Sequence, residues 1–490
     1  MKDSYKSMGG SRLSSLNKLS ARNRDKKSTL RSGAIALTAV AIAVGSSCPT
    51  SHAATIFVNT TDDELLSDSV GGSCTLREAV AAINSSSTTV NGNATGCTSS
   101  GSAFGTNDRI EFGAGLEGQT ISTLFGPEGI SLSRSLEFNR NNRDVSINSS
   151  GVSRGFSITG SNTSVILNSL TLTGGLTLTG SNNAQLYGSS IFANGGAELT
   201  ISNSTITANT AGAAAAVFVA GTGSQARIEN SVISNNVGQL GGAGANFGGG
   251  ILLDAGATLE VINSTISGNN GGVGGGIFAR DSNGITVRGT TISNNIAEQG
   301  SGLAAVNSSS ATIENSTISG NTANSSGGLF LNGSNFTINF STIADNSVPA
   351  DQNIGGFILT NNSSISMQNT ILSGSSFSDC FVTANSNFIA NPNTIIENPN
   401  NQDVGCSSNA RTRISPNLLP LADNGGPTMT HELGSGSAAF DTGNNCLATD
   451  QRGEPRPASM CNVGAWEGED PGGGFFVVPT ENGGSAIFQL

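Results

Sequence analysis

Few residues in this 490-residue sequence could do acid–base or nucleophilic chemistry. His431 is the only histidine after residue 53, which excludes zinc sites with several histidines and histidine pairs acting as acid and base. His431 could still activate a serine nucleophile with help from Asp441. No Gly-x-Ser-x-Gly turn accompanies it, so we assign no catalysis there.

Arginines in the central part of the chain are a second candidate, because a polysaccharide lyase needs an arginine or lysine base, commonly beside carboxylate-bound calcium. The arginines and the acidic residues near them are Arg227, Arg280, Arg288, Asp254, Glu260 and Asp281. Arg280 and Asp281 are adjacent, so a regular strand would point them to opposite faces.

A hydrolase would need paired carboxylates, and none recur at a spacing that places them on one strand face. The calcium-binding repeat Gly-Gly-x-Gly-x-Asp is also missing, so calcium is left open without a motif to support it. We therefore assign no catalytic, cofactor-binding or metal-binding residue.

A repeated phrase defines the elements that must position any such residues. Asn-Ser-Thr-Ile-Ser-Gly-Asn stands complete at 263–269 and at 315–321. Variants begin at Asn203, Asn230, Gly289, Phe340 and Asn369, so that the steps between copies are 27, 33, 26, 26, 25 and 29 residues. A repeat of this length predicts a solenoid or a propeller.

The spacing of apolar residues inside one repeat selects the kind of solenoid. Val261 and Ile266 are five residues apart, and an odd step between inward positions requires a corner, because strand side chains alternate. A third strand follows a glycine pair, as in Gly249–Leu252. Three strands and three corners in about 26 residues predict an all-β, right-handed parallel β-helix. The sequence lacks the leucine pattern of leucine-rich repeats and the blades of about 40 residues found in propellers. Its composition also disfavours helical repeats.

Recurrent asparagines are expected at two of the corners, where they tolerate left-handed backbone and bond tight turns. Stacked amides can also bond along the axis. The first expected stack is Asn203, Asn230, Asn263, Asn315 and Asn369, and the second is Asn209, Asn236, Asn269, Asn295, Asn321 and Asn346.

The first 53 residues differ from the rest and predict secretion. They hold 9 of the 22 basic and 2 of the 34 acidic residues, which leaves a net charge of −19 for the remainder. A basic stretch precedes the apolar run Gly33–Gly45 and a small-residue cleavage site between Ala53 and Ala54, as in a signal peptide. We expect the mature chain to have no transmembrane segment. We expect it to be secreted and to lie outside the cell or at the cell surface, where it could associate with the outer membrane. Its acidic surface disfavours nucleic acid.

Six cysteines remain after the signal peptide, which removes Cys48. Export makes disulfides plausible, and six cysteines allow 15 connectivities. The six cysteines fall into three pairs that are close in the sequence. Our hypothesis therefore pairs Cys74 with Cys97, Cys380 with Cys406 and Cys446 with Cys461.

A short helix is expected near the N-terminus, after a strand at 55–59. Thr75 and Glu78 form a capping-box pattern, and an amphipathic helix here would cover the open first coil. A catalytic role for Arg77 and Glu78 is the disfavoured alternative. The segment Val58–Asn84, centred on CTLREAVAAIN, resembles the N-terminal domain named for the CSLREA motif. That resemblance implies a secreted bacterial protein with parallel β-helix repeats.

The region 416–467 resembles the choice-of-anchor Q domain in its Asn-Gly-Gly-Pro-Thr, Asp-Gln-Arg-Gly and Gly-Ala-Trp-Glu pieces, with Trp466 replacing the usual Phe. The resemblance implies a secreted or surface bacterial protein and no common activity. Two roles are open for Asp450, Arg452 and Arg456. They could form a buried ion network that closes the last coil, which we favour, or they could bind a sugar acid. The tail after Asp470 carries no sorting motif or membrane span, which favours release or non-covalent retention.

The expected organisation is a signal peptide at 1–53, an N-terminal cap at 54–112, β-helix coils at 113–375, the choice-of-anchor Q-like region at 376–467 and a glycine-rich tail at 468–490. Two functions remain. The preferred one is a monomeric, non-enzymatic protein for adhesion or for recognition of extracellular glycan or matrix. The alternative is a polysaccharide-degrading enzyme of the pectate-lyase-like class. A cleft lined by arginine and two carboxylates from neighbouring coils would support the enzyme. A flat face lined by asparagine, serine and threonine would support the adhesion protein.

Overall fold

The computed structural model describes residues 54–64, 72–124, 126, 128–139, 141, 143–177, 186–238, 247–308, 310–349, 354–397, 406, 409–472, 475–479 and 485–489. The proposed signal peptide, with Ala53 on one side of the cleavage site, lies outside this range, and Ala54 begins it. No helix within the described ranges has the length and apolarity needed to cross a membrane.

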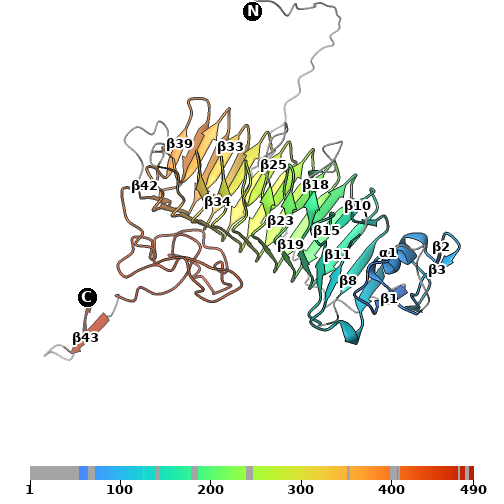
Figure 1. Cartoon of the computed structure of the whole chain (residues 1–490). Coiled ribbons are helices and arrows are strands. Elements are labelled where there is room, and N and C mark those ends of the chain that lie inside the picture. The colour runs from blue at the N-terminus through green and yellow to red at the C-terminus, as the bar shows by residue number, and fades with distance from the viewer. Residues whose placement is uncertain are drawn as a thin grey trace, which may run out of the picture. The chain divides into compact units, whose positions relative to one another are not determined.

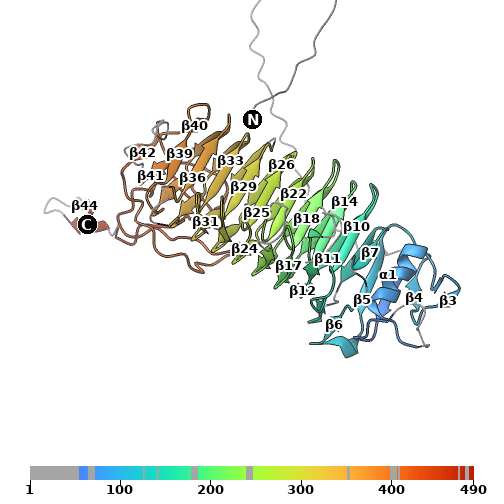
Figure 2. The same cartoon turned by 45° about the horizontal axis from the view of Figure 1, so that its top comes forward.

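Three long sheets run side by side along the coils (Figures 1 and 2). Sheet 1 contains β4 (Ser99–Gly101), β1 (Ala54–Val58), β5 (Asp108–Phe112), β8 (Leu136–Asn139), β11 (Ser164–Asn168), β15 (Glu198–Ser202), β19 (Gln225–Glu229), β23 (Thr258–Ile262), β26 (Gly284–Arg288), β30 (Ala311–Glu314), β34 (Asn335–Asn339), β37 (Ser364–Gln368) and β40 (Asn387–Ala390).

Sheet 2 contains β6 (Thr120–Ser122), β9 (Ser146–Asn148), β12 (Thr171–Thr173), β16 (Thr205–Thr207), β20 (Val232–Ser234), β24 (Thr265–Ser267), β27 (Thr291–Ser293), β31 (Thr317–Ser319), β35 (Thr342–Ala344), β38 (Ile371–Ser373), β41 (Ile395–Ile396) and β42 (Arg411–Thr412). Sheet 3 contains β7 (Ile130–Leu132), β10 (Phe156–Thr159), β14 (Ile191–Asn194), β18 (Val217–Ala220), β22 (Ile251–Asp254), β25 (Ile277–Arg280), β29 (Leu303–Val306), β33 (Leu329–Asn332), β36 (Phe357–Thr360) and β39 (Cys380–Val382).

Shorter pairs complete the secondary structure. They are β13 (Leu176–Thr177) with β17 (Thr210–Ala211) and β21 (Val237–Gly238), β28 (Ile296–Ala297) with β32 (Thr322–Ala323), β2 (Thr89–Val90) with β3 (Asn93–Ala94), and β43 (Phe475–Pro479) with β44 (Ser485–Gln489). The 3₁₀ turn η1 spans Ala114–Leu116.

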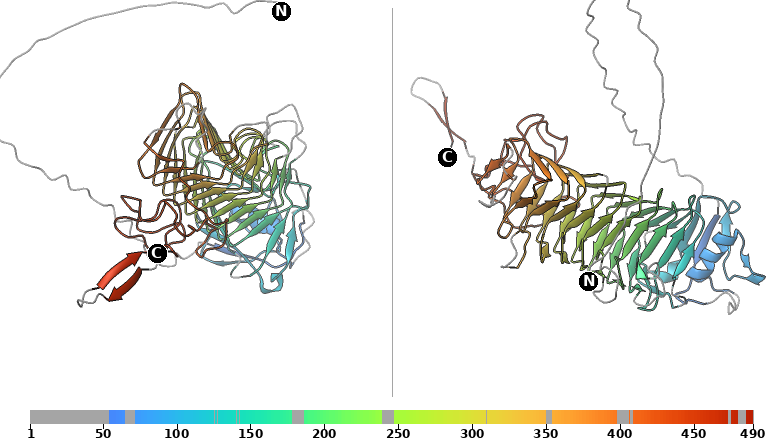
Figure 3. Two further views of the ribbon diagram at one scale, coloured as in Figure 1. Left: turned by 90° about the vertical axis from the view of Figure 1, so that its left-hand side faces the viewer. Right: turned by 90° about the horizontal axis from the view of Figure 1, so that it is seen from above.

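Each coil strand pairs in parallel with its counterpart one coil away, which confirms the predicted right-handed parallel β-helix. In sheet 1 the register runs Glu198, Gln225, Thr258, Gly284. Figure 3 shows the stacked coils from two further sides. The strands of these sheets run from β1 to β42.

The interior is filled by aliphatic columns from the inward faces of the strands. One column holds Ile201, Ile228, Val261, Val287, Ile313 and Ile338, each fully buried. Full burial of such a side chain stabilises a fold by about 1.5–3 kcal/mol. The predicted five-residue step is present, because β15 ends at Ser202, Asn203 turns with a φ of 50°, and β16 begins at Thr205.

The second asparagine stack is a continuous hydrogen-bonded ladder, as predicted. The side-chain amide of each residue from Asn209 to Asn321 donates to the Oδ1 atom of the next, at 2.9–3.0 Å. Each Oδ1 from Asn236 to Asn346 also accepts the backbone N–H one coil before. Because these residues are almost fully buried, the ladder also satisfies backbone groups at the corner.

The first expected asparagine stack is not such a ladder. Asn203, Asn230, Asn263, Asn315 and Asn369 all have φ between 45° and 50° and serve as left-handed corner residues. The bonding column is instead one residue later, where Ser231 Oγ accepts the backbone N–H of Ser204 and Ser264 Oγ accepts that of Ser231, both at 3.1 Å.

Helix α1 (Leu76–Ser85) contacts β1, β5 and β7 near the first coil. Its predicted capping box is present. Glu78 is buried in that box, and Arg77 forms a bidentate ion pair with Asp63 at 2.8 and 2.9 Å. Both residues therefore have structural partners, as the preferred interpretation requires.

The C-terminal segment 416–472, here named the clasp, lies against the outer face of sheet 2 at β27, β31 and β35. In Figure 1 it is the brown irregular chain beside the coils. Thr291, Thr317 and Thr342 are buried beneath it, whereas the equivalent Thr205 and Thr265 are partly exposed. The structure contains the three disulfides of our hypothesis, and Cys446–Cys461 lies within the clasp.

Candidate functional site

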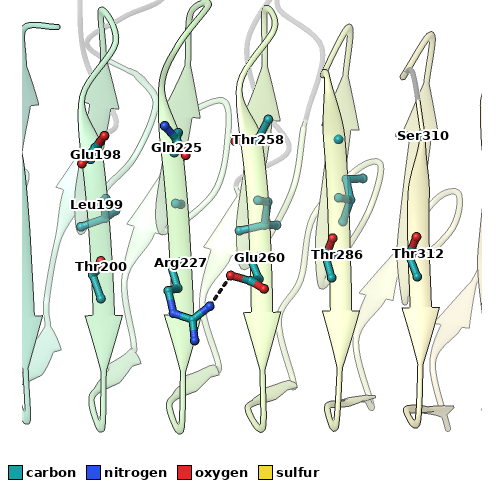
Figure 4. Close-up of a pocket in the computed structure, with 14 residues that line it drawn as sticks. Glu198, Leu199, Thr200, Gln225, Arg227, Thr258, Glu260, Thr286, Ser310 and Thr312 are labelled. Carbon is teal, nitrogen blue, oxygen red and sulfur yellow. Dashed lines mark hydrogen bonds and ion pairs between the residues drawn. The ribbon is translucent and has the colours of Figure 1, made fainter. Parts of the chain in front are cut away.

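A groove of about 460 Å³ lies on the outer face of sheet 1. Figure 4 shows that its side chains stand in rows across β15, β19, β23, β26 and β30. One row holds Glu198, Gln225 and Thr258, and the next holds Thr200, Arg227, Glu260, Thr286 and Thr312. Strand alternation places these polar residues outside, since the residues between them fill the interior.

Arg227 lies in the groove and is held by two carboxylates. Its Nη2 and Nε atoms donate to Glu229 at 2.7 and 3.1 Å, and Nη1 donates to Glu260. Burial lowers the pKa of Arg227, but the hydrogen bonds and charges of Glu229 and Glu260 outweigh it and raise that pKa above its ordinary value. A lyase base must lose its proton, so this environment opposes the catalytic role that the sequence left open.

The polar face continues along sheet 1 into a second hollow of about 240 Å³. Its lining is mostly amide and hydroxyl side chains, among them Asn335, Thr337, Ser364 and Asn387. The outer face of sheet 1 therefore changes from mixed charge near β19 to uncharged polar groups near β37. Both kinds of group bind hydroxyl-rich ligands by hydrogen bonds.

A third hollow of about 300 Å³ lies where the corner after sheet 1 meets the clasp. Arg288 and Glu314 come from neighbouring coils, with Arg288 Nε 3.8 Å from Glu314 Oε1. Thr449, Gln451 and Arg452 of the clasp complete the lining. Sequence reasoning singled out Arg288 but could not place the clasp beside it.

Arg280 lies on a different face from the other two arginines. It ends β25 in sheet 3 and forms an ion pair with Asp254, its register partner on β22, with Nε 3.1 Å from Oδ1. Its guanidinium carbon lies 4.6 Å from the Phe247 ring centroid. Asp281 is a corner residue with a φ of 50°, not part of a regular strand as assumed above. The three arginines therefore do not form one site.

The outer face of sheet 3 is also closed by a second apolar layer. Phe192, Phe218 and Phe278 project outward yet are buried, and Tyr187 and Phe247 pack on them with ring-centroid distances of 4.9 and 5.2 Å. The sequence pattern did not predict this layer, because the rings that cover the strand residues, Tyr187 and Phe247, come from the connections before the strands. The two polar hollows described above lie on sheet 1 instead.

Asp450, Arg452 and Arg456 form an ion network, the alternative that the sequence analysis favoured over a sugar-acid site. Arg452 Nε donates to Asp450 at 2.9 Å, and Arg456 Nη1 donates to Glu467 at 2.8 Å. Arg456 also donates to the carbonyls of Asn462 and Gly464. The network lies within the clasp rather than at the last coil, and Arg456 links it to the coils by donating to Asn315 Oδ1 at 3.4 Å.

His431 belongs to the clasp, is buried where the clasp meets the coils, and faces a serine of β31. Its Nε2 lies 2.8 Å from Ser319 Oγ, and its Nδ1 lies 2.7 Å from the Leu419 carbonyl. The Nδ1–H must donate to the carbonyl, so Nε2 accepts the Ser319 hydroxyl. Both residues are at most 2% exposed, which denies a substrate access. The Asp441 backbone N–H donates to Asn462 Oδ1, and the acidic neighbour of His431 is Asp345 at 3.9 Å.

We expect acidification below pH 6.5 to weaken clasp docking through His431. Desolvation lowers the pKa of His431, and its bond to Leu419 and the charge of Asp345 only partly oppose this. The unfolded chain takes up a proton near pH 6.5 and the folded chain only at lower pH, so stability falls as pH drops below 6.5. Denaturation midpoints at pH 7.5 and 5.5, followed by the emission of Trp466, the only tryptophan, measure this.

The matched variant is His431→Gln, which should show a smaller loss of stability between these pH values. Burial raises the pKa of Glu467, and that carboxyl acts in the opposite sense because its folded form binds the proton more readily. It is present in both proteins and cancels in the comparison. Equal pH dependence in the two proteins would contradict the assignment.

No group of three histidine, cysteine, aspartate or glutamate residues suited to a metal ion occurs in the part of the chain that the structure describes. The groove residues Glu198, Gln225 and Thr258 were missed by sequence reasoning. The pattern that could have identified them is the alternation of outward and buried residues in their strands, seen clearly in Thr258–Ile262, where every second residue had to face outward.

Comparison with known proteins agrees with the architecture. Residues 249–419 match the family model described as the right handed beta helix region. A search of curated proteins finds no match. Among solved structures, the crystal structure of pectate lyase Pel9A aligns at 12% identity with a TM-score of 0.32, covering 74% of this chain and 88% of that chain. The strand pairing, rather than this alignment, establishes the fold.

Proposed function

We propose that this chain is a secreted or cell-surface recognition protein that binds an extended, largely uncharged glycan along the outer face of sheet 1. The observation that carries the proposal is the groove across β15 to β30, lined by parallel rows of amide, hydroxyl and charged side chains. Successive coils repeat these groups about every 4.8 Å. A regular array of donors and acceptors suits a polymer whose hydroxyls also repeat.

The charge of this face supports an uncharged polymer. Its outward positions carry Glu111, Glu137, Glu198, Glu229, Glu260 and Glu314 against Arg109, Arg227 and Arg288. The excess of carboxylates, on a chain that is acidic overall, repels polyanions such as nucleic acids or uronate polymers. Adhesion to a neutral matrix polysaccharide is the role that follows.

Polysaccharide degradation is the alternative, and one observation favours it. The groove brings Arg227 together with Glu198 and Glu260 from neighbouring coils, which meets the geometric condition set for an enzyme. The raised pKa of Arg227 argues against a lyase. Since a hydrolase would use the carboxylates instead, the assay below measures cleavage as well as binding.

We expect protein from Ala54 onward to co-sediment with at least one neutral insoluble polysaccharide among cellulose, chitin and xylan, without new reducing ends or absorbance at 235 nm. Replacing Glu198 and Gln225 together with alanine should weaken binding about tenfold, because two or three hydrogen bonds of roughly 0.5–1.5 kcal/mol are lost. Thr205→Ala on the outer face of sheet 2 is the matched control and should bind normally. New reducing ends would instead support the enzyme.

The proposal also includes secretion from a bacterial cell. Cleavage of a signal peptide before Ala54, a CSLREA-type N-terminal region and a choice-of-anchor Q-like clasp together support a secreted bacterial protein. The three disulfides suit an oxidising compartment. We propose a monomer that is secreted or held at the cell surface.

A further inference from the structure

We infer that the hollow between Arg288, Glu314 and the clasp is a separate subsite for one neutral sugar unit, an end or a branch of the glycan. This inference rests on the proposed function. It gives the clasp a direct part in recognition, in addition to covering sheet 2. The hollow of about 300 Å³ is at the small end of the range typical for ligand sites.

The position of the hollow connects it with the groove. Arg288 and Glu314 are the last residues of β26 and β30, two strands whose Thr286 and Thr312 also line the groove. A chain lying on sheet 1 therefore reaches the hollow at its edge. Asn263 and Asn315, both left-handed corner residues, form the wall on the coil side.

The arginine and the glutamate in this hollow form a loose ion pair without a hydrogen bond. Arg288 Nε lies 3.8 Å from Glu314 Oε1, which is too long for a hydrogen bond. The Arg288 side chain is 54% exposed. Arg227 differs, because its Nε and both terminal nitrogens bond to Glu229 and Glu260. Arg288 and Glu314 together offer donors and acceptors to a pair of adjacent hydroxyl groups.

The clasp side of the hollow is rigid and already bonded. Arg452 donates to Asp450, to the Asn424 carbonyl and to the Glu467 carbonyl. Asn315 Nδ2 donates to the Thr449 carbonyl at 2.8 Å, which ties this wall to the coils. A preformed wall lowers the entropy cost of binding a small ligand.

Charge selects the class of ligand. Arg288 and Arg452 balance Glu314 and Asp450, so the lining carries no net charge. An anion or a cation would gain from one side and lose on the other. An uncharged polyhydroxyl group can use both, since each hydroxyl donates to a carboxylate and accepts from a guanidinium.

The test is isothermal titration of the full mature protein with cellotetraose, chitotetraose, xylotetraose and the tetramer of galacturonate. We expect at least one neutral tetramer to bind, and Arg288→Ala and Glu314→Gln each to weaken it about tenfold with unchanged melting temperature. Arg109→Ala is the matched control, since that arginine stands on the same sheet face and pairs with Glu111 and Glu137. It should bind like the parent.

The outcomes separate this inference from the proposed function. Polymer binding on the groove with tetramer affinity unchanged by Arg288→Ala and Glu314→Gln would overturn the subsite alone. Tetramer binding lost in those variants, without polymer binding, would overturn recognition along sheet 1 and keep the subsite. Preference for the galacturonate tetramer, or no binding of any neutral tetramer, would overturn the subsite as described.

Discussion

Replacing Asn295 with alanine should lower the free energy of unfolding by about 3–5 kcal/mol, because several buried hydrogen bonds depend on this one side chain. Its Oδ1 accepts from the Asn269 backbone N–H and side-chain amide. Its Nδ2 donates to the Ile266 carbonyl and to Asn321. Alanine would leave buried donors of Asn269 without an acceptor, and each such group costs about 1–3 kcal/mol.

The measurement is the shift of the chemical denaturation transition relative to the parent protein. Asn324→Ala is the control, since Asn324 is exposed and outside the ladder, and it should change stability by less than about 0.5 kcal/mol. In a solenoid each coil is stabilised by its neighbours, so the damage should extend into adjoining coils. A loss below about 1 kcal/mol for Asn295→Ala would show that the ladder is not a main source of stability.

Replacing Arg456 with methionine should detach the clasp, at a cost of about 3–5 kcal/mol in its docking free energy. Arg456 is buried, bonds to Glu467 and two carbonyls, and lies with its guanidinium carbon 4.6 Å from the Phe340 ring centroid in the coils. Removing it leaves the Glu467 carboxylate without its charge partner. Burial already raises the pKa of Glu467 despite the arginine, so the unpaired carboxylate should be strongly disfavoured.

Trp466 reports this change, because it is buried between the clasp and the coils and should shift to longer emission wavelength on release. Limited proteolysis should then cleave within 416–472 in the variant only. The double variant Arg456→Met with Glu467→Gln should recover part of the lost stability, since the uncompensated charge is gone. Glu454→Gln, an exposed position in the same segment, should behave like the parent. Unchanged Trp466 emission in Arg456→Met would refute the role of this ion pair.

The sequence by itself determined the features that repeat. The odd step from Val261 to Ile266 required a corner, and the recurrence of copies every 25–33 residues required strands to pair one coil apart. The buried ladder that includes Asn295 and the capped helix at Thr75 also followed, because both depend on a local pattern. Each of these is a short-range rule applied many times, so a single chain displays it clearly.

Only the tertiary structure decided the contacts that occur once. Arg227 pairs with Glu260 because a coil of 33 residues makes the two register partners on β19 and β23, and the unequal steps between copies did not specify that pairing. His431 meets Ser319 across 112 residues, and Arg288 acquires the clasp as a neighbour. No period in the sequence encodes the contacts of His431 and Arg288, since they arise where the irregular clasp packs on the regular coils. Packing of that kind depends on the shape and burial of the whole surface, which are fixed only when the coils have assembled.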